Sequence, residues 1–232
     1  MTTAIGIMCK APQPGRTKTR LAMSIGSTVA AKLSACFLRD IAASIQAIPS
    51  TIGRRGFAVY TPAGAEPILR DLLPPDFGLL FQVGENLGEA LLGATRGLLA
   101  MQHDGVLLVN GDSPTLPSHF LVQAIEMLRQ PRDRVVLGPT SDGGYYLIGL
   151  KCPHETLFRG IDWGTESVFR CTCERADMIG LQTTVLPEWY DVDDDETLGW
   201  LRDELAGTSV RFRGGEKALA TRAYLATVLE IG

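Results

Sequence analysis

The segment that follows the first apolar run of the chain contains residue types that bind phosphate groups. This segment, KAPQPGRTKTRL, spans residues 10–21 and comes directly after the apolar residues 4–9. Within eleven residues it carries four cations: Lys10, Arg16, Lys18 and Arg20. Its prolines stiffen the backbone, and Gly15 lets the backbone turn with its amide groups exposed. Such a loop suits a diphosphate or a triphosphate, and a solvated basic loop is the alternative interpretation.

Two segments farther along the chain carry aspartates that could hold a divalent cation. Asp112 follows an apolar run, and Asp191 and Asp193 project to one face if their segment is extended. Mg²⁺ and Mn²⁺ are hard cations that take carboxylate and phosphate oxygens, so we expect these three aspartates to be ligands, with Asp112 at the reacting phosphates. The alternatives are a turn aspartate before Pro114 and a capping box formed by Asp193 and Glu196.

A third set of residues could serve an acceptor molecule. In SDGGYY, residues 141–146, the two glycines fit a tight hairpin. The functional alternative is that Gly143 and Gly144 admit a ligand to the backbone while Asp142 acts as general base on an attacking hydroxyl. Trp163 could form a wall of an acceptor pocket by stacking, or it could lie in the core. Residues 85–89 precede a helix whose N-terminus could meet an anion or a base.

Composition limits the classes of function. The chain has 232 residues and a formal net charge of −4, with 45% hydrophobic and 21% charged residues, which predicts one globular domain over residues 1–232 with a C-terminal tail and helix at 206–232. The acidic balance argues against a nucleic-acid partner. No apolar run is long enough for membrane insertion and no secretory leader is recognised, so we expect a cytoplasmic protein. Neither a P-loop nor a GxGxxG fingerprint is present.

The cysteines are interpreted as small buried hydrophobic residues rather than as ligands. There are five, an odd number: Cys9, Cys36, Cys152, Cys171 and Cys173. The spacing of the last two matches no zinc or redox pattern. With three histidines in the chain, the sequence argues against a Cys/His zinc site.

Strand-like and helix-like segments alternate along the chain, which predicts an α/β fold with a mainly parallel central sheet flanked by helices. We expect strands at 4–9, 57–61, 79–83, 105–110, 134–138 and 145–150. We expect helices at 27–47 with Ser27 as N-cap, 66–73, 87–101, 118–129 and 216–229, and a helix, a strand and a helix across 165–205. Ligands of such sheets bind beyond the carboxyl ends of the strands, so the basic loop and Asp112 would share one crevice.

Taken together, these segments resemble a bacterial family of GT-A-type nucleotide-diphospho-sugar transferase-like proteins, sometimes linked to arsenosugar biosynthesis. The matching segments are residues 10–21, 82–89, 109–114, 142–150, 163–165 and 191–193. The resemblance implies a Rossmann-like sheet with a nucleotide over the first loop. It also implies a metal at Asp112, where related enzymes carry the last residue of an Asp-x-Asp motif. Asn110 replaces the first carboxylate of that motif, which leaves Asp191 or Asp193 to supply the missing charge.

Three functions follow from these expectations. The first is transfer of a sugar from a nucleoside-diphosphate sugar to a small hydroxyl acceptor, with the loop cations on the diphosphate and Asp142 on the acceptor. The second is nucleotidyl transfer from a nucleoside triphosphate to a phosphorylated small molecule, because small guanylyltransferases share the fold and a basic first loop. The third is nucleotide binding without catalysis, which Asn110 supports. Nothing in the sequence excludes a homo-oligomer.

Overall fold

Seven strands form one sheet in the computed structural model, which describes residues 2–229. The strands are β1 (Thr3–Lys10), β2 (Arg54–Thr61), β3 (Gly78–Phe81), β4 (Gly105–Asn110), β5 (Arg134–Pro139), β6 (Tyr145–Leu150) and β7 (Gln182–Val185). Their order in the sheet is β3-β2-β1-β4-β6-β5-β7. Strand β6 runs antiparallel to β4 and β5, and the other neighbouring pairs are parallel. The expected mainly parallel α/β sheet is confirmed.

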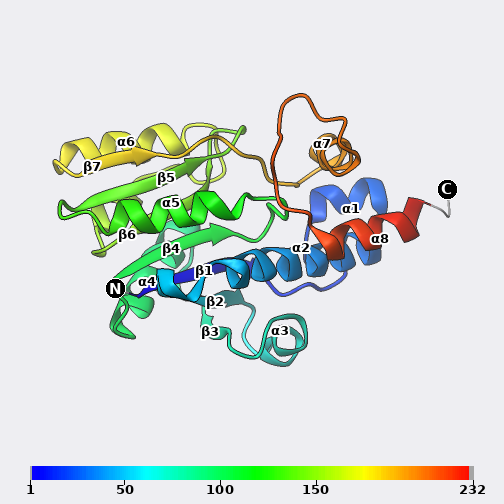
Figure 1. Cartoon of the computed structure of the whole chain (residues 1–232), viewed down its shortest axis with the longest axis horizontal. Helices are drawn as coiled ribbons and strands as arrows, with labels where there is room; N and C mark the ends of the chain where they lie inside the picture. The colour runs from blue at the N-terminus through cyan, green and yellow to red at the C-terminus, as the bar shows by residue number, and fades with distance from the viewer. Residues whose placement is uncertain (1, 230–232) are drawn as a thin grey trace.

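Helices cover both faces of this sheet (Figure 1). They are α1 (Thr19–Ile25), α2 (Ser27–Ala47), α3 (Glu66–Leu72), α4 (Leu87–Ala100), α5 (Ser118–Leu128), α6 (Val168–Met178), α7 (Asp195–Ala206) and α8 (Leu219–Leu229), with short 3-10 helices at Ser50–Ile52 and Glu155–Phe158. Strand β4 shows why two cores form: Leu107 and Val109 point to the core under α2 and α5, whereas Val106 and Leu108 point to the core under α4. The sheet is therefore buried on both sides, as parallel sheets require.

The first helix was not predicted, and the N-cap of the second was assigned wrongly. Helix α1 occupies part of the expected basic loop, where Leu21 is its buried residue. Seven residues are too few to show a helical pattern in the sequence. Helix α2 has the predicted bounds, but its N-cap is Gly26 with φ 82° rather than Ser27, and no side chain caps it.

The last helix starts later than predicted because its N-terminus is held by another helix. The buried carboxylate of Asp40, on α2, accepts hydrogen bonds from the backbone N–H groups of Ala220 (2.9 Å) and Thr221 (2.8 Å). Helix α8 therefore begins at Leu219 instead of residue 216. This contact attaches the C-terminal part of the chain to α2, beside which α8 lies in Figure 1.

The strand order places a ligand site between β1 and β4. These neighbours are parallel, with Met8 opposite Asn110 near their carboxyl ends. From β1 the sheet continues through β2 and β3 on one side, and β4 lies on the other, which makes this the topological switch point. Helices α1, α7 and α8 lie at the end of the molecule toward which β4 points (Figure 1).

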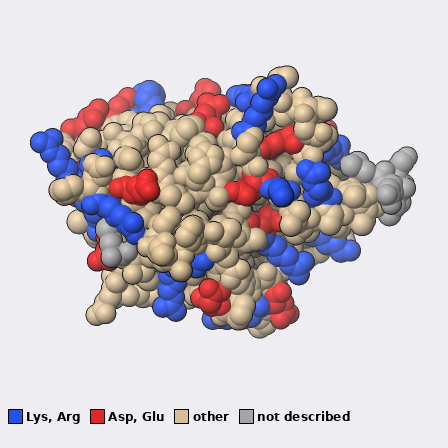
Figure 2. Space-filling model, in the orientation of Figure 1, with Lys and Arg blue, Asp and Glu red and all other residues tan. Residues whose placement is uncertain are grey.

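Two further observations concern the charges on the surface and the hydropathy of the helices. Acidic and basic side chains are interspersed over the face of the molecule seen in Figure 2. None of the helices in residues 2–229 combines the length and the hydropathy needed to cross a lipid bilayer.

Candidate functional site

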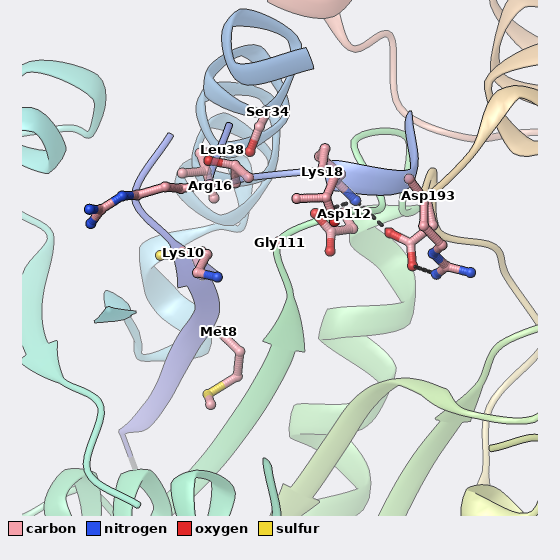
Figure 3. A pocket seen from close by; sticks show the side chains of 13 residues that line it. Met8, Lys10, Arg16, Lys18, Ser34, Leu38, Gly111, Asp112 and Asp193 are labelled. Carbon is pink, nitrogen blue, oxygen red and sulfur yellow. Dashed lines mark hydrogen bonds and ion pairs between the residues drawn. The ribbon is translucent and has the colours of Figure 1, made fainter. Parts of the chain in front are cut away.

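A cavity of about 290 Å³ lies at the carboxyl ends of β1 and β4 (Figure 3). The end of β1, the basic loop, α1, α2 and the loop after β4 surround it. Its lining residues are Met8, Cys9, Lys10, Arg16, Thr17, Lys18, Thr19, Arg20, Ser34, Leu38, Gly111, Asp112 and Asp193. The basic loop and two of the three candidate metal ligands thus meet in one crevice.

Lys18 connects the two loops. Its ammonium nitrogen lies 2.7 Å from Asp112 Oδ1 and 2.7 Å from Asp193 Oδ1, and it donates to the carbonyl of Val192 at 2.7 Å. The side chain is only 5% exposed and also lies over the ring of Phe37. Arg20 adds a second pair, 2.5 Å from Asp193 Oδ2. Lys18 and Arg20, which were expected on phosphate, therefore hold carboxylates in this structure.

Lys10 and Arg16 differ from the other two loop cations. Neither forms an ion pair within the part of the chain that the structure describes. Figure 3 shows Lys10 at the end of β1 and Arg16 extended away from Lys18. Gly15, with φ 73°, supplies the left-handed turn just before Arg16. These residues remain available to a polyphosphate.

The ion pairs favour the charged forms of Lys18 and Asp193, whereas burial raises the pKa of Asp112 above its usual value despite Lys18. Burial alone would lower the pKa of the Lys18 ammonium, but Asp112 and Asp193 raise it above its usual value. Burial opposes ionisation of Asp193, yet Lys18 and Arg20 hold the pKa of this carboxyl below its usual value. Lys18 is thus charged and Asp193 ionised at neutral pH. Lys18 also has a left-handed backbone (φ 52°, ψ 50°), which costs a non-glycine residue roughly 1–2 kcal/mol.

The segment that carries Asp191 and Asp193 runs alongside the loop after β4. The N–H of Val192 donates to the carbonyl of Asp112 (2.9 Å), and the hydroxyl of Ser113 donates to the carbonyl of Tyr190 (2.7 Å). The buried Tyr190 anchors the segment through its hydroxyl, which donates to Glu204 at 2.6 Å. These contacts explain how residues so far apart in sequence share one crevice.

The predicted capping box of α7 is wrong by one residue. Asp194 Oδ1 accepts from the N–H of Thr197 (3.0 Å), and the Thr197 hydroxyl accepts from the N–H of Asp194 (3.1 Å). Asp193 and Glu196 do not form this motif. Because Asp194 serves as the cap, the carboxylate of Asp193 is left for Lys18 and Arg20.

Asp191 is a partly buried carboxyl in an acidic environment. Burial, together with the nearby charges of Asp193, Asp142 and Asp112, raises its pKa to about 7. Within residues 2–229, no hydrogen bond or ion pair engages its side chain. The surroundings of Asp191 therefore oppose its ionisation, and the charge of Lys18 offsets this only in part.

The carboxylate oxygens of the crevice are ligands of the type that Mg²⁺ and Mn²⁺ prefer, but they do not surround one common point. The donors that line the cavity are the carboxylate oxygens of Asp112 and Asp193, which hard cations prefer. Asp191 does not line the cavity, and its side chain has no hydrogen-bond or ion-pair partner in the described part of the chain. In the described part of the chain, however, Asp112, Asp191 and Asp193 do not form a compact ligand group. The Lys18 ammonium lies between Asp112 and Asp193 instead. Asn110 turns its side-chain oxygen toward the N–H of Asp112 (3.4 Å).

The segment around Asp142 forms the predicted hairpin turn between β5 and β6. Asp142 Oδ1 accepts from the N–H of Gly144 (3.1 Å) and from the hydroxyl of Thr140 (2.5 Å). Gly143 has φ 88°, and a Cβ there would overlap the backbone of Glu166. The absent side chain of Gly143 thus accommodates the protein's own backbone rather than a ligand. None of residues 142–144 lines the cavity of Figure 3.

Trp163 belongs to a different cavity, of about 650 Å³, on the α4 side of the sheet. There it lies next to Gly88, where a Cβ would come within 2.7 Å of the indole ring. The N-terminus of α4 is capped internally, because Asn86 Oδ1 accepts from the N–H of Glu89 (3.0 Å). The structure therefore groups Trp163 with residues 85–89, two segments that the sequence did not connect.

Sequence reasoning missed the part of the crevice that α2 provides. Ser34 and Leu38 line the cavity from this helix, where they occur within an ordinary amphipathic pattern. It also missed how Thr17 closes the basic loop. The Thr17 hydroxyl accepts from the N–H of Gln13 (2.8 Å) and donates to its carbonyl (3.0 Å). No sequence pattern distinguishes either contribution.

Comparison with solved structures identifies the class of fold. A protein from Desulfovibrio desulfuricans G20, provisionally named a nucleotide-diphospho-sugar transferase, is 29% identical, with 99% of this chain and 98% of that chain covered and a TM-score of 0.83. A CMP:2-keto-3-deoxy-manno-octonic acid synthetase complexed with CTP has a TM-score of 0.59 at 9% identity, over 90% of this chain and all of the other. Glucosyl-3-phosphoglycerate synthase from Mycobacterium tuberculosis, in complex with Mn²⁺, UDP and glucosyl-3-phosphoglycerate, has a TM-score of 0.52 at 11% identity, over 99% of this chain and 79% of the other. The expected nucleotide-diphospho-sugar transferase fold and the transferase class are confirmed.

The chain belongs to the family DUF2064, described as uncharacterized proteins conserved in bacteria, which matches residues 45–165. No curated protein matches the chain.

Proposed function

We propose that this protein transfers a sugar from a nucleoside-diphosphate sugar to a small hydroxyl acceptor. The observation that carries the proposal is the meeting of the basic loop with Asp112 and Asp193 in one cavity at the switch point of the sheet. Similarity to the Desulfovibrio protein over nearly the whole chain supports it. The whole chain acts as one domain, with its C-terminal part attached through α8 to α2.

In this proposal Lys10 and Arg16 have a different role from Lys18 and Arg20. Lys10 and Arg16 bind the diphosphate, because neither has a carboxylate partner among residues 2–229, and Gly15 brings backbone amides to the same place. Lys18 and Arg20 position the aspartates. The Lys18 ammonium lines the same cavity, where it would add positive charge beside the leaving diphosphate.

Asp112, Asp191 and Asp193 would hold Mg²⁺ or Mn²⁺ if Lys18 gives way between them. A bound cation of this kind supplies charge neutralisation to phosphate oxygens. Asp142 would orient or deprotonate the acceptor hydroxyl through Oδ2, because its Oδ1 is engaged by the turn. Trp163 would contribute by stacking on a part of the substrate that reaches the separate cavity on the α4 side of the sheet.

Nucleotidyl transfer is the second candidate. The similarity in fold to a synthetase complexed with CTP and the cationic loop favour it, because a triphosphate suits such a loop as well as a diphosphate does. The third candidate is nucleotide binding without turnover. The pairing of Lys18 with Asp112 and Asp193 favours it, since this arrangement is satisfied without a metal.

Product analysis separates the three candidates. The full chain is incubated with panels of nucleotide sugars and nucleoside triphosphates together with small hydroxyl and phosphorylated acceptors, each with and without Mg²⁺ or Mn²⁺. We expect release of free nucleoside diphosphate; release of pyrophosphate means nucleotidyl transfer, and saturable binding without a product means a binding protein. Asp112→Asn should abolish turnover, whereas Asp71→Asn, an exposed change on α3, should leave it unchanged.

A further inference from the structure

A second group of potential metal ligands lies at the end of the sheet opposite to the crevice. Strand β5 begins and β6 ends there, and their antiparallel register pairs Val136 with Gly149. Asp133 immediately precedes β5, and Cys152 follows the end of β6 by two residues, so both lie at this end of the sheet. His154 follows two residues later. The ligand atoms of Asp133, Cys152 and His154 all lie within 4.8 Å of one another.

Hydrogen bonds hold the side chains of Asp133 and His154 and the turn that carries Cys152 and His154. Asp133 Oδ1 accepts from the N–H of Arg134 (3.0 Å), which leaves Oδ2 to meet His154 Nε2 at 2.8 Å. The N–H of His154 donates to the carbonyl of Cys152 (3.0 Å), so the two residues lie in a tight turn. Lys151 ties the end of β6 to the preceding loop by donating to the carbonyls of Gln130 (2.8 Å) and Arg132 (3.1 Å).

The chemistry of this group differs from that of the aspartate crevice. A thiolate, an imidazole and a carboxylate together are typical ligands of Zn²⁺, whereas carboxylate oxygens alone suit Mg²⁺ or Mn²⁺. Tetrahedral ligands about 2.0 Å from zinc lie about 3.3 Å apart, so Asp133 and His154 need to separate only slightly. Cys152 is exposed, contrary to the prediction that the cysteines are buried, and a cavity of about 910 Å³ adjoins Asp133 and His154. A solvent molecule can therefore complete the coordination.

We propose that Asp133, Cys152 and His154 form a zinc site with three protein ligands and one open position. Binding replaces the hydrogen bond between Asp133 Oδ2 and His154 Nε2 with two bonds to the metal. The proton of that hydrogen bond passes through solvent to Nδ1, so the imidazole stays neutral, and the thiol proton of Cys152 is released to solvent. The sequence argued against a Cys/His zinc site because the chain has three histidines and the spacing of Cys171 and Cys173 matches no zinc pattern. The ligands proposed here come instead from the ends of two paired strands. The proposal does not depend on the transferase activity.

Cobalt spectroscopy of the metal-free full chain tests this site, because Co²⁺ bound to a thiolate gives a charge-transfer absorption that carboxylates do not. We expect the absorption to saturate at one equivalent and to disappear on addition of Zn²⁺. Cys152→Ser should abolish it, while Cys171→Ser and Asp112→Asn should retain it. His154→Gln should weaken Zn²⁺ binding roughly tenfold or more. Circular dichroism checks that each variant is folded. No charge-transfer absorption, or one that survives Cys152→Ser, would overturn the proposal.

Discussion

Lys18 Nζ lies 2.7 Å from Asp112 Oδ1, which joins the loop after β1 to the loop after β4. Both residues come from loops at the switch point, and the lysine is almost fully buried. The pair therefore contributes to the stability of the fold as well as to the electrostatics of the crevice. Lys18 and Arg20 also pair with Asp193, so the network of ion pairs joins residues far apart in the sequence.

Replacing Lys18 by methionine should destabilise the protein. The change keeps the length of the side chain but leaves Asp112 without its cation and Asp193 with Arg20 alone. Loss of one partner from a fully buried pair costs about 3–5 kcal/mol, and because these carboxylates are partly exposed we expect about 1–3 kcal/mol. Urea unfolding measures the difference. Lys32→Met, an exposed change on α2, is the control; equal stability of the two variants would contradict the role of Lys18.

Replacing Arg16 by alanine should weaken nucleotide binding without unfolding the protein. Arg16 lines the cavity and has no carboxylate partner in residues 2–229, so its removal takes away a charged contact to phosphate. The expected loss is about tenfold or more in affinity for the tightest nucleoside diphosphate in a panel. Calorimetric titration provides the measurement. Arg39→Ala, on the exposed side of α2, should bind as the parent does, and a normal affinity of Arg16→Ala would remove this residue from the site.

Asp191→Asn should stabilise the metal-free protein at pH 8 and have little effect near pH 4. The folded pKa of Asp191 is raised to about 7 from an ordinary value of 3.8. As the pH rises between these values, the unfolded chain loses this proton and the folded chain keeps it. Stability therefore falls by a few kcal/mol, and the loss is complete above about pH 7. Asparagine removes this dependence.

Melting temperatures of the Asp191 variant and its parent between pH 4 and pH 8.5 give the readout. Asp71→Asn, which changes an exposed aspartate, should give a constant difference from the parent. A constant difference for Asp191→Asn would contradict the raised pKa. Addition of Mg²⁺ or Mn²⁺ at pH 8 should stabilise the parent more than the variant, because the parent has one more carboxylate for the cation.

Asp40→Ala should weaken the attachment of α8. Two backbone N–H groups lose their buried acceptor, at an expected cost of about 2 kcal/mol. In this variant, hydrogen exchange of the backbone amides in residues 219–229 should be faster than in the parent, and the change should be larger there than in the sheet. Asp71→Ala serves as the matched control. Unchanged exchange in α8 would mean that packing alone holds the helix.

Gly143→Ala should cost more stability than Gly164→Ala. Both glycines have positive φ (88° and 84°), so alanine imposes a backbone strain of roughly 1–2 kcal/mol at either position. Only Gly143 also meets a close neighbour, the backbone of Glu166, whereas a Cβ at Gly164 meets nothing within 4 Å. Thermal unfolding compares the two variants directly. Equal costs would show that the turn can move away from Glu166.

The sequence predicted the elements better than it predicted the partners of the site residues. The bounds of β4, β6 and α2 agree with the prediction, because continuous apolar runs and a long amphipathic pattern depend on local residues. The capping box was displaced by one residue, since three consecutive aspartates offer three equivalent starts. The pairing of Lys18 with Asp193 joins residues 175 positions apart, and no local pattern encodes it.

The large sequence separation of the crevice residues has a consequence for how the folding chain acquires its ligand-binding site. The crevice needs Lys18 from the first loop, Asp112 from the middle of the chain and Asp193 from beyond the last strand, whereas the family match covers only residues 45–165. Contacts between distant residues form late, because loop closure must precede them. Acquisition of ligand affinity during refolding would therefore mark completion of the native topology, and an excised central fragment would be inert.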